Sequence, residues 1–136
     1  MGVQIAALLV ATGRSVQLFD LANSSDLNAG ARSGVARGLN ARPSAFYTPE
    51  MADLIELGSF DDLSALAEAD WIIEAIVEEE SAKRALLARI EAEVGERAVV
   101  SSNTSGLSIA QLIQGRKADF SRRFLGVHFF NPPRQM

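Results

Sequence analysis

An apolar run, an amphipathic helix and a second apolar run follow one another in the middle of this chain. This succession constrains the fold more than any other feature. Residues 71–77 read WIIEAIV, an apolar and β-branched sequence typical of a strand buried on both faces. Residues 80–94 have the period of an amphipathic helix, and residues 98–101 (AVVS) predict another strand. The apolar face of that helix comprises Ala82, Leu86, Leu87 and Ile90. A strand, a helix and a strand in this order predict a βαβ unit with parallel strands.

The same alternation continues on either side. Residues 1–12 have helical spacing and end at Gly13, and residues 15–19 (SVQLF) predict a strand that ends at Asp20. Residues 21–40 have helical spacing interrupted by several glycines. The remaining segments predict strands at 54–57 and 124–130, short helices at 61–67 and 108–113, and loops at 41–50 and 114–123. Strands that alternate with helices predict an α/β fold with a doubly wound, mostly parallel sheet.

Length and composition exclude several classes of protein. A chain of 136 residues is one domain at most, and 48% hydrophobic with 22% charged residues is typical of a globular protein. A net charge of −4, without clusters of Lys and Arg, argues against a nucleic-acid surface. The absence of cysteine and the single histidine argue against a metal site.

We also expect no membrane partner, because no apolar run approaches the ~20 residues of a membrane-spanning helix. Val3 to Val10 could pass for the core of a signal peptide. However, no Lys or Arg precedes it and Gln4 interrupts it. The expected location is therefore cytoplasmic.

The single histidine lies in FLGVHFFNPP, residues 124–133. Because proline supplies no N–H group and restricts the residue before it, Asn131-Pro132-Pro133 predicts an abrupt end to the strand. His128 would then lie near the carboxyl end of a parallel strand, where open α/β sheets bind ligands. The residues alone leave two interpretations open: a ligand-binding histidine, or a core histidine bonded to a backbone carbonyl.

Three segments together resemble one family. Residues 74–78 (EAIVE, with Lys83 five residues on), 101–105 (SSNTS) and 126–133 (GVHFFNPP) are similar to the NAD-binding domain of 3-hydroxyacyl-CoA dehydrogenases. Their order and spacing fit across nearly the whole chain. Residues 41–63 and the ending NPPRQM look most like the long bacterial members that carry an additional enoyl-CoA hydratase-like region.

The resemblance implies catalytic roles for His128, Ser105 and Asn131. His128 matches the family's base, and an imidazole that titrates near neutral pH can take the proton of a 3-hydroxyl group. Ser105 and Asn131 match the polar residues that hold the substrate oxygen and the end of the cofactor near that histidine. The structural alternatives are turn capping for Ser105 and a strand-ending Asx turn for Asn131.

The resemblance also implies that the cofactor is NAD. Asp20 matches the acid that binds the adenosine ribose hydroxyls and repels the 2′-phosphate of NADP; its alternative role is a helix N-cap. Ala75 and Glu78 match the loop beside the nicotinamide ribose. Lys83 matches a cofactor-contacting lysine, and its alternative is a solvated position on a helix. Gly2 matches the third glycine of the family's GxGxMG turn, the one that permits close packing of helix and strand.

Two parts of the family pattern are missing from residues 1–136. The first strand and most of the Gly-rich turn are absent, and this strand is central in the usual order 3-2-1-4-5-6. The glutamate that orients the catalytic histidine would lie beyond Met136, as would the C-terminal helical domain. We therefore expect residues 1–136 to be a partial NAD-binding domain, truncated at both ends.

The function that the resemblance implies is oxidation of (3S)-3-hydroxyacyl-CoA to 3-oxoacyl-CoA with NAD in fatty-acid β-oxidation. The partners would be an acyl-CoA substrate and, in a full-length enzyme, a second copy of the chain. One alternative is a non-catalytic nucleotide-binding or structural fragment. Another is a dehydrogenase of small hydroxy acids, against which the HFFNPP segment argues because those enzymes more often use a lysine base.

We predict that the purified 136-residue chain alone has little or no dehydrogenase activity. It lacks the phosphate turn, the carboxylate that orients the histidine and the domain that covers the substrate. The measurement is oxidation of NADH in the presence of acetoacetyl-CoA, and robust turnover by the purified chain would contradict the prediction.

Overall fold

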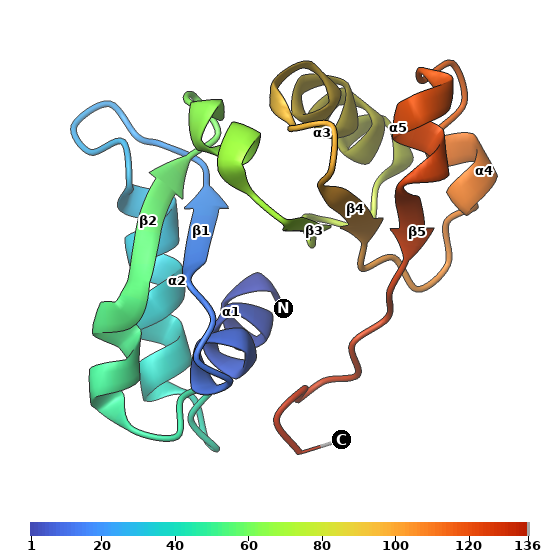
Figure 1. The fold of residues 1–136 in the computed structure, drawn as a ribbon. Helices are drawn as coiled ribbons and strands as arrows, with labels where there is room; N and C mark the ends of the chain where they lie inside the picture. Colours follow the sequence, from blue (N-terminus) through green and yellow to red (C-terminus); the bar gives the residue numbers. More distant parts are fainter. Residues whose placement is uncertain (136) are drawn as a thin grey trace. The chain divides into compact units, whose positions relative to one another are not determined.

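The computed structural model describes residues 1–135, which divide into two compact units. Among the described residues, unit 1 comprises residues 1–62 and 129–135, and unit 2 comprises residues 63–128. Both units combine helices with parallel strands, as Figure 1 shows. The expected α/β class with parallel pairing is therefore confirmed.

Unit 1 contains two strands and the helices that pack on them. Its elements are α1 (Gly2–Ala11), β1 (Val16–Asp20), α2 (Ala29–Asn40), the 3₁₀ helix η1 (Pro49–Leu54) and β2 (Ile55–Ser59). The two strands pair in parallel, from Val16 with Ile55 to Asp20 with Ser59. In Figure 1, α2 lies behind the two strands. Gly13 follows α1 with a φ of 79°, the left-handed conformation for which glycine is suited, as the sequence predicted.

The helix expected at residues 21–40 begins only at Ala29. The side chain of Asn23 accepts hydrogen bonds from the amides of Ser25 and Asp26, and Asp26 accepts one from the amide of Asn28. These local bonds satisfy the backbone in a loop and so compete with helix formation. Gly38 lies where a side chain has little room, because a Cβ atom there would be 3.1 Å from Phe46 and from Val3.

Unit 2 contains a three-stranded sheet in the order β3-β4-β5, with every pair parallel. The middle strand β4 pairs Val99 with Trp71 of β3 and Ser102 with Gly126 of β5. The elements of the unit are η2 (Ser64–Glu68), β3 (Trp71–Glu74), α3 (Glu80–Glu93), β4 (Val99–Ser102), α4 (Ile109–Leu112), α5 (Ala118–Arg122) and β5 (Phe124–Gly126).

Two strands of unit 2, β3 and β5, are shorter than the sequence predicted, whereas β4 keeps its predicted length with a shift of one residue. β3 ends at Glu74, and Trp71 is 41% exposed, so this strand is not buried on both faces. β5 ends at Gly126 rather than at residue 130, because its partner β4 ends at Ser102 and the last bond runs from the Val127 amide to the Ser102 carbonyl at 3.0 Å. The loop expected at 114–123 contains α5, which buries Phe120.

Helix α3 agrees with its predicted bounds, but its buried face differs. The buried residues are Lys83, Leu87 and Ile90, at the i, i+4 and i+7 spacing of one helical face. A lysine therefore occupies a core position. The carboxylate of Glu79 caps the helix by accepting from the amides of Ser81 and Ala82.

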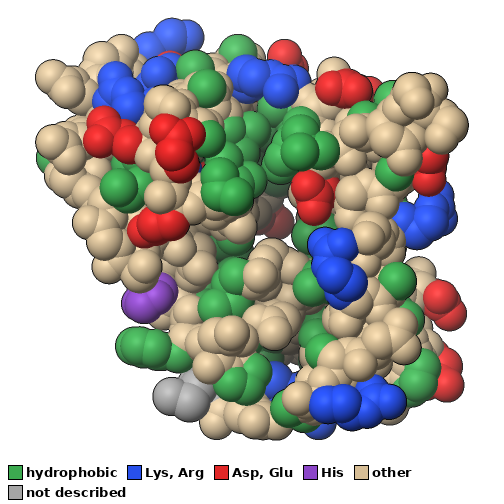
Figure 2. Space-filling model, turned by 180° about the vertical axis from the view of Figure 1, so that it is seen from behind, with side chains coloured by type: hydrophobic (Ala, Val, Ile, Leu, Met, Phe, Trp, Pro, Cys, Tyr) green, Lys and Arg blue, Asp and Glu red, His purple; other side chains and the backbone are tan. Residues whose placement is uncertain are grey.

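Within each unit the strand order agrees with the parallel, doubly wound fold that the sequence predicts: β1 pairs with β2, and β4 lies between β3 and β5. No helix in the described part of the chain is long and apolar enough to cross a membrane. Figure 2 shows Lys and Arg side chains interspersed with Asp and Glu on one face.

Candidate functional site

Glu74, the last residue of β3, belongs to a buried polar network of unit 2. Its side chain is fully buried and accepts three hydrogen bonds. The donors are the Lys83 ammonium at 2.8 Å, the Ile76 amide at 2.7 Å and the hydroxyl of Ser102 at the end of β4. One carboxylate therefore ties β3 to β4, to α3 and to the loop that joins β3 to α3.

Lys83 contributes an ammonium group to this network, and its side chain is also fully buried. Besides Glu74, its Nζ donates to the carbonyl of Ile76 at 3.3 Å and lies 3.5 Å from Oε2 of Glu78. The alternative of a solvated helix position is therefore excluded. A buried ammonium group is tolerated because two carboxylates and a carbonyl replace the water that it loses.

Glu78 connects this network to the turn that follows β4. Its Oε1 accepts from Thr104 Oγ1 at 2.5 Å, from the Ser105 amide at 2.9 Å and from the Gly106 amide at 3.0 Å. The Ser105 hydroxyl lies farther off, at 3.5 Å. Residues 104–106 are therefore wrapped around one carboxylate oxygen, and we call them the Glu78-bound turn.

The donors around Glu78 stabilise its charged form. The hydroxyl of Thr104 contributes most to lowering the pKa of Glu78, from its ordinary 4.5 to about 2. The amides of Gly106 and Ser105 and the charge of Lys83 act in the same direction, and partial desolvation opposes them. The Glu78 side chain is 41% exposed, so it can accept bonds from a ligand while it holds the turn.

Ser105 and His128 follow the carboxyl ends of neighbouring strands in unit 2. Ser105 lies in the Glu78-bound turn after β4, and His128 lies two residues beyond β5. Because parallel strands end at the same edge of their sheet, both side chains belong to that edge. Both residues are exposed, so the alternative of a core histidine is excluded. The histidine is visible at the surface in Figure 2.

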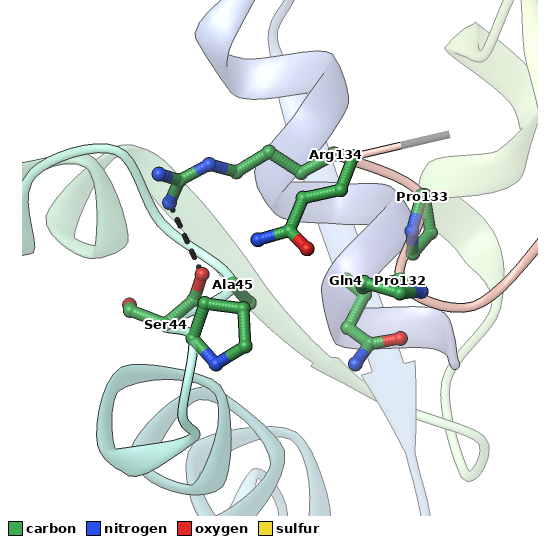
Figure 3. Close-up of a pocket in the computed structure, with 8 residues that line it drawn as sticks. Gln4, Ser44, Ala45, Pro132, Pro133 and Arg134 are labelled. Atoms are coloured by element: carbon green, nitrogen blue, oxygen red, sulfur yellow. Dashed lines mark hydrogen bonds between the residues drawn. The ribbon is translucent and has the colours of Figure 1, made fainter.

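Asn131 lies in the segment after His128 that belongs to unit 1. This segment is anchored by Arg134, whose Nη1 donates to the carbonyls of Ser44 at 3.1 Å and Phe46 at 2.7 Å. The guanidinium group also lies 4.1 Å from the centre of the Tyr47 ring. Figure 3 shows Arg134 reaching Ser44 beside a cavity of about 10 Å³, room for about one water molecule. The cavity is too small for a dinucleotide.

The other two predicted residues of unit 1 lie on α1 and β1. Asp20 ends β1 half-buried, and its Oδ1 accepts from the amide of Leu21 at 2.8 Å. The carboxylate is thus oriented by its own backbone with part of its surface open. A Cβ atom on Gly2 would meet Leu18 at 3.8 Å, an ordinary contact, so packing alone does not require glycine there. Both assignments to the cofactor stay predictions.

Ala75 lies half-buried directly after β3, in the loop that Glu74 holds through the Ile76 amide. Its place beside a nicotinamide ribose also stays a prediction. Glu74, Ser102 and Thr104 lie at the centre of the network, although the sequence alone predicted no role for them. Two features of the sequence could have indicated this buried network: Glu74 lies inside an apolar run, and Lys83 has the helical spacing of Leu87 and Ile90.

The sequence profile of the family "3-hydroxyacyl-CoA dehydrogenase, NAD binding domain" matches residues 1–136. The chain belongs to this family. The resemblance found in the sequence and the cofactor class, NAD, are therefore confirmed.

Relatives and solved structures agree with the family. A Deinococcus radiodurans protein named "Probable 3-hydroxyacyl-CoA dehydrogenase" is 47% identical over all of this chain and 40% of its own length. A "Fatty acid oxidation complex subunit alpha" of Pseudomonas syringae is 46% identical over 49% of this chain and 9% of its own length. The crystal structure of 3-hydroxybutyryl-CoA dehydrogenase from Escherichia coli covers the whole chain with a TM-score of 0.76 and 30% identity, over 29% of its own length.

These comparisons also confirm the Rossmann-like fold, which the dehydrogenase family shares. The chain spans less than half the length of the relatives that it matches. The activity, substrate and partners of a whole protein are therefore matters for proposal.

We predict that Glu78 makes the stability of the folded chain depend on acid pH. Between pH 4.5 and about 2 the unfolded chain binds a proton that folded Glu78 does not. Its contribution to stability is therefore complete above the unfolded value and is lost as the pH falls toward about 2. Denaturant unfolding at several pH values should show a smaller loss of stability with acid for Glu78→Gln than for the wild type.

The matched control is Glu96→Gln, which changes an exposed glutamate of unit 2 outside the network. This variant should keep the wild-type loss of stability between pH 4.5 and about 2. Equal pH slopes for the wild type and Glu78→Gln would show that Glu78 does not hold the turn.

Proposed function

We propose that residues 1–136 form the cofactor-binding part of an NAD-dependent (3S)-3-hydroxyacyl-CoA dehydrogenase of fatty-acid β-oxidation. The proposal rests on the residues at the carboxyl-end edge of the unit 2 sheet. Ser105 and His128 follow the adjacent strands β4 and β5 there, and Glu78 holds the turn that contains Ser105. A base and a hydroxyl donor at the carboxyl ends of neighbouring parallel strands suit chemistry on an alcohol.

NAD supplies the acceptor for the hydride that leaves C3 of the substrate. The residues present fit such a cofactor. The half-buried carboxylate of Asp20 can accept hydrogen bonds from the adenosine ribose hydroxyls, and its charge disfavours a 2′-phosphate. The exposed part of Glu78 can accept from the hydroxyls of the nicotinamide ribose, next to Ala75. Gly2 begins α1, and as the third glycine of the family's turn it would permit close packing of this helix against a strand.

His128 takes the proton of the 3-hydroxyl group in this proposal. Its exposure gives a substrate access to the imidazole. Ser105 holds the substrate oxygen with its hydroxyl, which the Glu78-bound turn directs. Asn131, three residues after His128, holds the substrate oxygen or the end of the cofactor.

We propose that Lys83 acts on the cofactor site indirectly, through Glu78. Its ammonium group is fully buried and is satisfied by Glu74, Glu78 and the Ile76 carbonyl. Direct contact with a cofactor would require this network to open. The geometry supports an indirect role, in which the charge of Lys83 favours the charged form of Glu78 and Glu78 meets the cofactor.

We further propose that these residues are a partial NAD-binding domain, completed by a helical domain that covers the acyl-CoA and forms a homodimer. The matched region is 40% and 9% of the length of two relatives, which supports the presence of further domains in a complete protein. Sequencing of the flanking DNA would test it. The expected result is a coding sequence that continues past Met136 into a glutamate, placed to orient His128, and a helical domain.

We predict that His128→Asn, made in the polypeptide of the complete coding sequence, loses dehydrogenase activity. Asparagine has no group that titrates near neutral pH, so kcat/KM for 3-hydroxybutyryl-CoA and NAD should fall about 10²–10⁴-fold. Binding of NAD, followed by the quenching of protein fluorescence, should be unchanged. The matched control is Gln114→Asn, an exposed polar residue of the same unit, which should keep full activity.

Comparable activity of His128→Asn and the wild type would refute the assignment of the base. A wild-type polypeptide that binds NAD without turnover would favour the non-catalytic alternative.

Asp20→Ala should weaken NAD binding and reduce the preference for NAD over NADP. The variant removes both the acceptor for the ribose hydroxyls and the charge that repels a 2′-phosphate. Calorimetry gives the dissociation constants of NAD and NADP, and the ratio of the two constants measures the preference. Asp53→Ala, at an exposed acid of unit 1, is the control and should keep the wild-type ratio. An unchanged ratio in Asp20→Ala would remove Asp20 from the cofactor site.

A further inference from the structure

Two carboxylates share one buried ammonium group in unit 2. The Lys83 Nζ lies 2.8 Å from Oε1 of Glu74 and 3.5 Å from Oε2 of Glu78. At these distances Lys83 interacts more strongly with Glu74, because the attraction between charges falls with their separation. The interaction of Lys83 with Glu78 is therefore the weaker of the two.

Glu74 cannot follow Lys83 if the ammonium group moves. Its carboxylate is also bound by the Ile76 amide at 2.7 Å and by the Ser102 hydroxyl, both from neighbouring backbone segments. The side chains of Glu74 and Lys83 are both fully buried. The place of the ammonium group is thus set by a carboxylate that is itself fixed at the end of β3.

The position of the Lys83 ammonium group determines whether the Glu78 carboxylate can stay in place to accept hydrogen bonds from the turn. Oε1 of Glu78 accepts from Thr104, Ser105 and Gly106, whereas only Oε2 faces Lys83. If Lys83 lost its closer carboxylate, Glu78 would be the one carboxylate left beside a buried cation. The cation would then draw Glu78 inward, away from the donors of the turn.

We propose that Glu74 is a positioning residue for Ser105. By holding Lys83 at the end of β3, its buried carboxylate leaves Glu78 free to bind the turn that places the Ser105 hydroxyl. The part of this inference that concerns catalysis rests on the proposed function, since only there does Ser105 touch a substrate. The part that concerns the turn does not.

The test compares three chains by NMR: the wild type, Glu74→Gln and the double variant Glu74→Gln/Lys83→Met. Glutamine keeps the shape of Glu74 and its acceptor oxygen but removes the charge. In Glu74→Gln we expect the amide proton signals of Ser105 and Gly106 to move upfield, because their carboxylate acceptor withdraws. In the double variant no cation draws Glu78 away, so these two signals should return toward their wild-type positions.

This rescue separates positioning from a general structural role. If Glu74 only supported the packing of unit 2, the double variant would disturb the turn at least as much as the single variant. Unshifted signals in Glu74→Gln, or larger shifts in the double variant, would overturn the proposal. If Glu74→Gln does not fold, the double variant alone decides: wild-type signals support the proposal and displaced signals overturn it.

The matched control is Glu91→Gln, on the helix that carries Lys83. Glu91 is a mostly buried carboxylate that pairs with Arg116 at 3.3 Å and accepts from the Lys117 amide at 2.7 Å. Its loss removes the same charge and a similar set of bonds at the other end of α3. The Ser105 and Gly106 signals should stay at their wild-type positions in this variant, and shifts as large as those of Glu74→Gln would overturn the proposal.

A kinetic measurement links the turn to catalysis. In the polypeptide of the complete coding sequence, Glu74→Gln should lower kcat/KM for 3-hydroxybutyryl-CoA by about tenfold to a hundredfold, since small displacements of positioning groups have effects of this size. The double variant should recover part of the loss. A wild type without turnover whose NMR signals show the rescue would refute the proposed function alone. An active wild type matched by Glu74→Gln would overturn the positioning role.

Discussion

The buried ion pair between Glu74 and Lys83 is the interaction on which unit 2 depends. Both side chains are fully removed from solvent, and breaking such a pair by removing one partner costs about 3–5 kcal/mol because the other charge is left alone. Replacement of both partners by apolar groups is often neutral, so the pair is weak evidence for stability as such. Its importance lies in its connections. Through Ser102, Ile76 and Glu78 it fixes the ends of two strands and the start of a helix relative to one another.

The candidate site is built on those strand ends. Glu78 is the point at which the buried network reaches the surface, because one oxygen binds the turn after β4 and the other faces Lys83. The turn carries Ser105, and His128 follows the neighbouring strand. A reactive edge formed by loops needs rigid support from beneath. In this domain of the 3-hydroxyacyl-CoA dehydrogenase family, a charged network provides that support.

Much of the fold could be predicted from the sequence, because hydrophobic periodicity and glycines at the ends of helices are local signals. Helix α3, the glycine after α1 and the parallel pairing are examples. The end of β5 could not be predicted, since it depends on where β4 ends. Lys83 was open to misreading because helical position alone does not reveal a partner nine residues earlier. The family and its cofactor could be predicted from three short motifs, whereas the role of Glu74 required the tertiary structure.

The carboxylate of Glu78 holds the turn that carries Ser105. Amide hydrogen exchange of Ser105 and Gly106 in the folded chain tests it most directly, because both amides lie in an exposed turn where Glu78 is their acceptor. Both amides should exchange more slowly than an unbonded loop amide and should lose this protection in Glu78→Gln. Exchange at the unprotected rate in the wild type would contradict it.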